Sequence, residues 1–64
     1  MRATIMALRE KADLTQTELA ERLGVTQGAV SQWEHGLAHP SIRLLPKLAD
    51  ILGCTVDELL RETA

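Results

Sequence analysis

Two histidines and one cysteine are the residues whose types would suit metal chemistry in this chain of 64 residues. His35 and His39 have a helix-like spacing, and Cys54 would be a third zinc ligand. The loop around Gly36 and Pro40 breaks any helix between the histidines, and no C-x-x-C pair completes a tetrahedral set. The sequence therefore predicts no metal site.

Groups that would support catalysis are also missing from the sequence. Cys54 would need an oriented base beside it to act as a nucleophile, and no residue pattern indicates one. There are no paired carboxylates, no glycine-rich phosphate loop and no Ser-His-Asp set. We therefore expect a protein that is not an enzyme and that uses no cofactor.

The composition indicates a small all-helical protein. The apolar fraction is 45%, but Phe and Tyr are absent and Trp occurs once, so Leu, Ile, Val and Ala must fill the interior. Leu and Ala favour helices, and β-branched and aromatic residues are too sparse for a sheet. A single cysteine excludes an intramolecular disulfide, and no apolar run approaches the roughly 20 residues of a membrane span. These observations predict one cytoplasmic domain over residues 1–64 with no membrane partner.

The net charge of −2 argues mildly against a nucleic-acid partner, because DNA-binding domains are usually basic. The distribution of charge weakens this objection. Residues 1–14 carry a net +1, residues 15–47 are neutral, and residues 48–64 carry a net −3. The acidic end of the chain would then face away from DNA.

Start and stop signals divide the chain into five expected helices. Thr-x-x-Glu capping boxes at residues 15–18 and 55–58 open the second and fifth helices. Thr26 and Ser41 are the expected caps of the third and fourth, and Asp13 stands where a left-handed residue would end the first. The expected helices cover residues 3–12, 16–23, 27–34, 42–52 and 56–60.

The fourth of these helices contains a proline one turn from its start. Pro46 removes one helical hydrogen bond and should bend or tighten the first turn. The apolar spacing predicts a buried face made of Ile42, Leu45, Leu48, Ala49 and Leu52.

Residues 16–35 have the pattern of a helix-turn-helix. The turn Leu23-Gly24-Val25 is short and contains a glycine, which lets two helices cross steeply. Ala20 is small where the second helix packs closely, and Gly24 tolerates a positive φ. Val30 is the inward anchor of the third helix, and the rest of this core would be Leu19, Leu23, Val25 and Trp33.

These segments resemble the Cro/CI-type (XRE-like) family of phage and bacterial helix-turn-helix regulators. The resemblance rests on LRE (8–10), LTQTELAERLGVTQGAVSQWEHG (14–36), PSIRLLPKLADILG (40–53) and TVDELL (55–60). It implies an all-α, compact five-helix bundle of the λ-repressor-like kind. Members typically bind operator DNA as dimers.

The resemblance also implies a role for individual residues. Gln16 matches a position that contacts a phosphate and braces the recognition helix, and Arg43 matches a basic position that contacts the DNA backbone. Base-reading positions fall on the third helix, where a glutamine amide suits adenine N6 and N7. The implied DNA-binding residues are Gln16, Thr26, Gln27, Gly28, Ser31, Gln32 and Arg43.

Two further matches and two departures follow from the same resemblance. Arg9 and Glu34 match a family ion pair, which we expect to be largely buried and structural. The loop at residues 37–39 lacks the basic residues that family members often have there, and Gly28 has no side chain with which to read a base.

The apolar residues of the fifth helix allow two interpretations. Val56, Leu59 and Leu60 would either close the core or form a two-fold dimer patch, and some of them would serve both roles. A two-fold dimer would place two recognition helices one turn of DNA apart, about 34 Å.

The sequence therefore predicts a sequence-specific regulator of transcription that binds double-stranded DNA. The expected form is a repressor that binds a pseudo-palindromic operator as a weak homodimer, with the third helix in the major groove. The alternative is a protein-interaction module, such as an antitoxin or adaptor, that binds a protein partner through its acidic C-terminal region. The chain would also suit the DNA-binding part of a longer protein.

Overall fold

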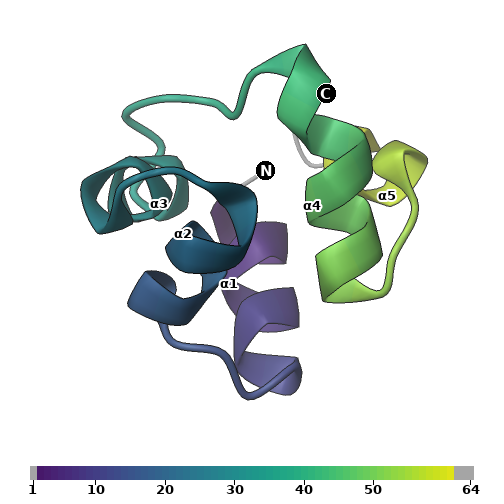
Figure 1. Ribbon diagram of the computed structural model, residues 1–64. Helices are drawn as coiled ribbons and strands as arrows, with labels where there is room; N and C mark the ends of the chain where they lie inside the picture. The colour runs from purple at the N-terminus through teal and green to yellow at the C-terminus, as the bar shows by residue number, and fades with distance from the viewer. Residues whose placement is uncertain (1, 62–64) are drawn as a thin grey trace.

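Residues 2–61, the part of the chain that the computed structural model describes, contain five α-helices and one turn of 3₁₀-helix, joined by turns and loops (Figure 1). No strand occurs in this range. The expected all-α, five-helix fold is confirmed. The elements are α1 (Arg2–Lys11), α2 (Gln16–Leu23), α3 (Gln27–Glu34), η1 (Ile42–Leu44), α4 (Leu45–Leu52) and α5 (Val56–Arg61).

Threonine caps are present, as predicted, at the N-termini of α2, α3 and α5. The Thr15 hydroxyl accepts a hydrogen bond from the Glu18 N–H at 3.0 Å, and the Glu18 carboxylate accepts one from the Thr15 N–H at 2.9 Å. Thr55 and Glu58 form the same reciprocal pair before α5. Such caps satisfy N–H groups that the first turn of a helix leaves without a partner, and so they fix where each helix begins.

The ends of the first two helices also follow the sequence. Asp13 has a φ of 59°, as expected for a left-handed residue that ends a helix. At the end of α2, Gly24 has a φ of 73°, and the Val25 N–H donates back to the Ala20 carbonyl at 3.0 Å. This bond closes a Schellman motif, which reverses the chain within one residue.

The fourth helix differs from its prediction at its first turn. Because Pro46 has no N–H, the Leu45 N–H donates to the Ile42 carbonyl instead, and the turn tightens into η1. The Ser41 side chain makes no capping hydrogen bond, so the expected cap is wrong. The expected burial of Ile42 is also wrong: it is 84% exposed, because this turn stands beyond the other helices (Figure 1).

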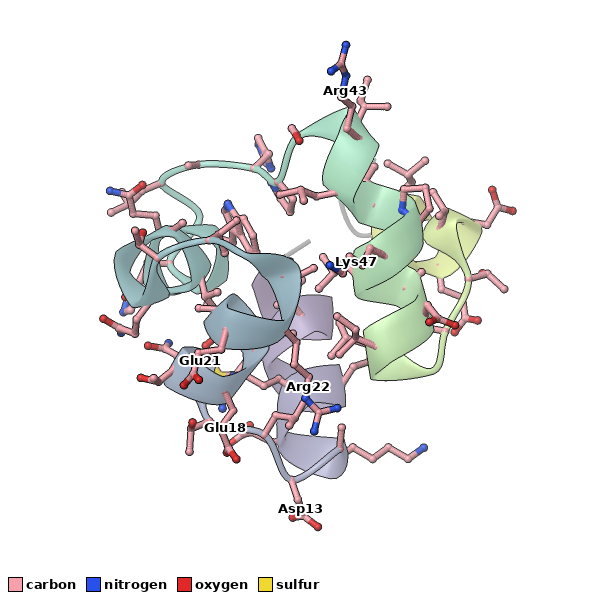
Figure 2. The ribbon with its side chains drawn as sticks, viewed as in Figure 1. Asp13, Glu18, Glu21, Arg22, Arg43 and Lys47 are labelled. Carbon is pink, nitrogen blue, oxygen red and sulfur yellow. The ribbon has the colours of Figure 1, made fainter. Side chains whose placement is uncertain are left out.

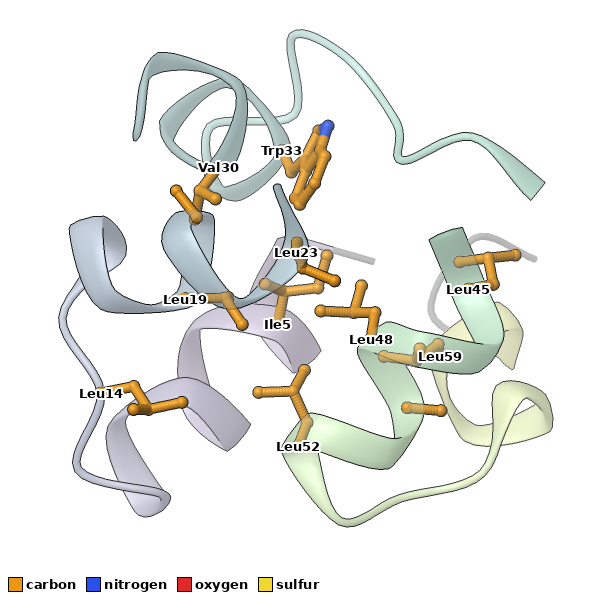
Figure 3. Packing of buried hydrophobic residues seen from close by; sticks show 12 residues of the cluster. Ile5, Leu14, Leu19, Leu23, Val30, Trp33, Leu45, Leu48, Leu52 and Leu59 are labelled. Carbon is orange, nitrogen blue, oxygen red and sulfur yellow. The ribbon is translucent and has the colours of Figure 1, made fainter. Parts of the chain in front are cut away.

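The core lies between helices α1, α2 and α3 on one side and helices α4 and α5 on the other. Ile5, Leu23 and Leu48 point toward one another at its centre, from α1, α2 and α4 respectively (Figure 3). Trp33 is buried beside them, as expected for a structural residue. The buried apolar residues are Ile5, Leu14, Leu19, Ala20, Leu23, Val30, Trp33, Leu45, Leu48, Ala49, Leu52 and Leu59.

The three apolar residues of α5 have different environments. Of the two interpretations, the structure supports core closure for Leu59, which is fully buried in the core of its own chain and presents no surface to a dimer partner. Val56 is half-buried against the core, and Leu60 is 42% exposed. The reason is the docking of α5 on α4, which turns one face of this short helix inward.

Candidate nucleic-acid interface

The turn at Gly24 docks α3 against α2 and leaves one face of α3 in solvent. Val30 on α3 and Ala20 on α2 are buried on the inner side of this contact. The outer face of α3 carries Gln27, Gly28 and Gln32, which are all exposed, and Ser31, which is half-buried. The packing therefore presents the predicted base-reading residues together on one accessible helix face.

A line of hydrogen-bonded side chains connects this face to the interior. The Gln27 Nε2 donates to the Gln16 Oε1 at 2.7 Å, and the Gln16 Nε2 donates to the Glu34 Oε1 at 2.9 Å. Glu34 in turn accepts from Arg9. Gln16, at the first position of α2, thus bonds to residues at both ends of α3. Arg9 on α1 is the last residue in this series of hydrogen bonds.

Arg9 and Glu34, the pair expected from the resemblance, meet in a bidentate ion pair. The Arg9 Nε lies 2.7 Å from the Glu34 Oε2, and its Nη2 lies 3.1 Å from the Oε1. The Arg9 Nη1 also donates to the Leu14 carbonyl at 2.8 Å. The Glu34 side chain is only 1% exposed, and that of Arg9 is 14% exposed. A planar guanidinium matches a carboxylate in this geometry, so the contact fixes orientation as well as charge.

This environment keeps Glu34 ionised. Burial opposes the charged form, but hydrogen bonds from Arg9 and Gln16, together with the Arg9 charge, lower the pKa of Glu34 below its usual value. The hydrogen bond to Glu34 raises the pKa of Arg9 in return. The carboxylate is therefore an acceptor only, and every neighbour must donate to it.

The side chains left available on α3 have the chemistry that base edges need. One N–H and the carbonyl oxygen of the Gln27 amide have no partner among the described residues, and neither does the amide of Gln32. Adenine presents a donor at N6 and an acceptor at N7, which a glutamine amide matches with one N–H and one carbonyl.

Thr26 and Gly28 lie at the start of α3. The Thr26 hydroxyl accepts from the Ala29 N–H at 3.1 Å, which leaves its hydrogen to donate outward. A Cβ built on Gly28 would have only this hydroxyl oxygen within reach, at 3.9 Å. The position is therefore open, and the glycine is not required by packing.

The open space at Gly28 leads to a prediction about stability. Replacing Gly28 with alanine should raise the free energy of unfolding by about 0.5–1 kcal/mol, because alanine loses less backbone entropy in a helix. Urea unfolding followed by circular dichroism measures this. Gly24→Ala is the matched control and should destabilise, since its φ of 73° strains any residue with a Cβ. A Gly28→Ala protein less stable than wild type would contradict the prediction.

Ser31 and His35 interact one helical turn apart, which the sequence analysis missed. The His35 Nδ1 lies 2.7 Å from the Ser31 carbonyl oxygen and 3.4 Å from its hydroxyl. Because a carbonyl only accepts, the Nδ1 carries the proton in this contact. The spacing of four residues was the available signal, and the imidazole reaches this backbone group because α3 ends there.

Arg43 lies apart from the α3 residues. It sits on η1, and its side chain points away from the body of the molecule, at the end opposite to Asp13 and Glu18 (Figure 2). No hydrogen bond joins it to the Gln16–Gln27 pair. The adjoining loop exposes Leu37 at 79%.

The remaining candidates for chemistry are Cys54 and the two histidines. Cys54 is partly buried against the core, and burial, followed by the Glu58 charge, raises the pKa of its thiol. Within residues 2–61, no group of three or more His, Cys, Asp or Glu side chains is placed to hold a metal ion. No helix in the same range has the length and hydropathy needed to cross a membrane.

Known regulators of transcription have sequences similar to this chain. The HTH-type transcriptional activator BcrR of Enterococcus faecalis is 39% identical over 56 residues, which are 88% of this chain but only 28% of that protein. An HTH-type transcriptional regulator of Methanothermobacter thermautotrophicus is 43% identical over 53 residues, 83% of this chain and 77% of the relative. Both names describe regulators of transcription and neither describes an enzyme.

A solved structure has the same arrangement of helices. The crystal structure of the P22 c2 repressor in complex with a synthetic operator matches with a TM-score of 0.83 and 36% identity, over 88% of this chain and 85% of that one. A helix-turn-helix family model matches residues 5–59, which contain α2, α3 and the turn between them. The chain therefore belongs to the helix-turn-helix family, of the Cro/CI type that its sequence resembles.

Proposed function

We propose that this protein binds double-stranded DNA as a sequence-specific regulator of transcription, acting as a repressor in the cytoplasm. The observation that carries the proposal is the exposed face of α3, on which the Gln27 amide is held by Gln16 with one N–H and its carbonyl still available. The similarity of the chain to the P22 c2 repressor, whose solved structure contains an operator, supports the same proposal.

In this proposal α3 enters the major groove and reads bases with Gln27 and Gln32. The N-termini of α2 and α3 offer backbone N–H groups to phosphates, next to Gln16 and Thr26. Arg43 adds a contact to the DNA backbone at a distance from the reading helix. Ser31 has an accessory role, and Gly28 leaves its base pair unread.

We also propose that the protein binds as a weak two-fold dimer. A dimer places two copies of α3 about 34 Å apart, so the operator would be pseudo-palindromic. Leu59 lies in the core, whereas Val56 is half-buried and Leu60 is 42% exposed, so we assign this contact to Val56 and Leu60. Weak dimerisation fits the small apolar area that they offer.

Selection of random duplex DNA on the purified protein tests the proposal. At about 100 mM salt we expect enrichment of a pseudo-palindrome. Gln27→Ala should relax one position in each half-site and cost about 1–3 kcal/mol of discrimination there, and Gln32→Ala should relax a different one. Arg43→Ala is the comparison, because loss of a phosphate contact should weaken all sequences alike.

The net charge of −2 keeps a second candidate function open, that of a module that binds a protein partner. Residues 48–64 concentrate the acidic charge, which would suit a basic partner surface. The two candidates differ in a salt titration, because DNA affinity falls with a log–log slope set by the number of phosphates contacted. Absence of any enriched duplex at low salt would reject the DNA-binding proposal in favour of the protein partner.

A further inference from the structure

We propose that Glu34 is a positioning residue that makes the Gln27 amide prefer adenine over guanine, acting through Gln16. This inference rests on the proposed function and deepens it. It concerns a buried carboxylate that does not lie on the exposed face of α3, and whose contact with Arg9 gives it an obvious structural role.

The first step is the orientation of Gln16. Glu34 is ionised and buried, so it can only accept hydrogen bonds. The Gln16 amide must therefore turn its Nε2 toward the Glu34 Oε1, where it lies at 2.9 Å. A reversed amide would place the Gln16 carbonyl oxygen against the carboxylate, which is repulsive in a site with little water.

The second step passes this orientation to Gln27. With its Nε2 toward Glu34, Gln16 presents its Oε1 to Gln27 and accepts from the Gln27 Nε2 at 2.7 Å. Gln27 is then left with one N–H and its carbonyl oxygen. Adenine offers a donor at N6 and an acceptor at N7 and fits this pair, whereas guanine offers two acceptors, at O6 and N7.

The reverse orientation would favour the other purine. If the Gln16 amide turned over, its Nε2 would donate to the Gln27 carbonyl, and Gln27 would have two N–H groups to offer. That pattern matches the O6 and N7 acceptors of guanine. Two amides in contact allow either direction, so the negative charge of Glu34 is what breaks the symmetry of the pair.

Two variants of the full chain remove the influence of Glu34 on the Gln27 amide in different ways. Glu34→Gln places an amide where either direction is allowed, and Gln16→Met removes the connection while leaving the Arg9–Glu34 ion pair intact. The second variant keeps the test valid if the first folds poorly. Glu21→Gln is the matched control for charge, since Glu21 is an exposed residue of α2 outside this line of hydrogen bonds.

The measurement is the ratio of affinities for two duplexes that carry adenine or guanine at the position assigned by Gln27→Ala. Glu34→Gln and Gln16→Met should each lower this ratio about 10-fold, and Glu21→Gln should leave it unchanged. A purely structural role for Glu34 would weaken both duplexes alike. A ratio that stays at the wild-type value in both variants overturns the proposal, although DNA binding would stand.

A measurement on the free protein separates the two proposals. NMR should detect a coupling across the hydrogen bond from the Gln27 side-chain nitrogen to the Gln16 side-chain carbonyl carbon, and this coupling should weaken in Glu34→Gln. Its absence in wild type overturns the positioning role whatever the DNA result. If the coupling is present but wild type selects no base through Gln27, the proposed function fails, and the specificity role of Glu34 fails with it.

Discussion

Replacing Arg9 with methionine should lower the free energy of unfolding by about 3–5 kcal/mol, the largest effect we expect from one substitution outside the apolar core. The Glu34 side chain is 1% exposed, so loss of Arg9 would leave a buried charge for which, among residues 2–61, Gln16 is the one remaining hydrogen-bond donor. The Leu14 carbonyl would lose its Arg9 donor as well. Urea unfolding at pH 7 measures the loss.

The pH dependence should change sign in this variant. In wild type the pKa of Glu34 is lowered on folding, so its contribution to stability is present above the unfolded pKa, about 4.3, and is lost as the pH falls through the folded value. Without Arg9, burial dominates and raises the folded pKa. The contribution is then present at low pH and is lost as the pH rises. The two proteins should therefore differ less in stability at pH 3 than at pH 7.

The double variant Arg9→Met with Glu34→Leu is the control for this interpretation. Removing both charges leaves no buried ion, so much of the lost stability should return. A double variant no more stable than Arg9→Met alone would show that lost packing, and not the stranded carboxylate, explains the effect.

Leu59→Ala should destabilise the protein by about 2–5 kcal/mol, because it removes a fully buried side chain and leaves a cavity between α4 and α5. The loss should be independent of protein concentration, since it arises within one chain. Thermal unfolding at several concentrations measures both quantities.

Leu60→Ala is the matched comparison on the same helix. Leu60 is 42% exposed, so its truncation should cost less, about 1 kcal/mol. If Leu59→Ala were no more destabilising than Leu60→Ala, or if its effect grew with protein concentration, the assignment of Leu59 to the core would be wrong.

The sequence indicated most of the local structure correctly because the relevant contacts join near neighbours. The Thr15 and Thr55 capping boxes and the left-handed Asp13 each depend on residues within five positions of one another. Pro46 has an equally local effect, through one missing N–H. The exposure of Ile42 was not predicted, because burial of that side chain depends on whether another helix packs against the turn that carries it.

By itself, then, the sequence determined where α2 and α3 start and stop, the turn between them at Gly24, and the glutamines that α3 presents. Tertiary structure alone decided that Leu59 faces inward, that Ile42 faces solvent, and that Gln16 connects Gln27 to Glu34. Gln16 and Glu34 are 18 residues apart, and their contact exists only once α2 and α3 have docked. Helix caps are set by nearest neighbours along the chain, whereas these placements depend on helices that the chain brings together only on folding.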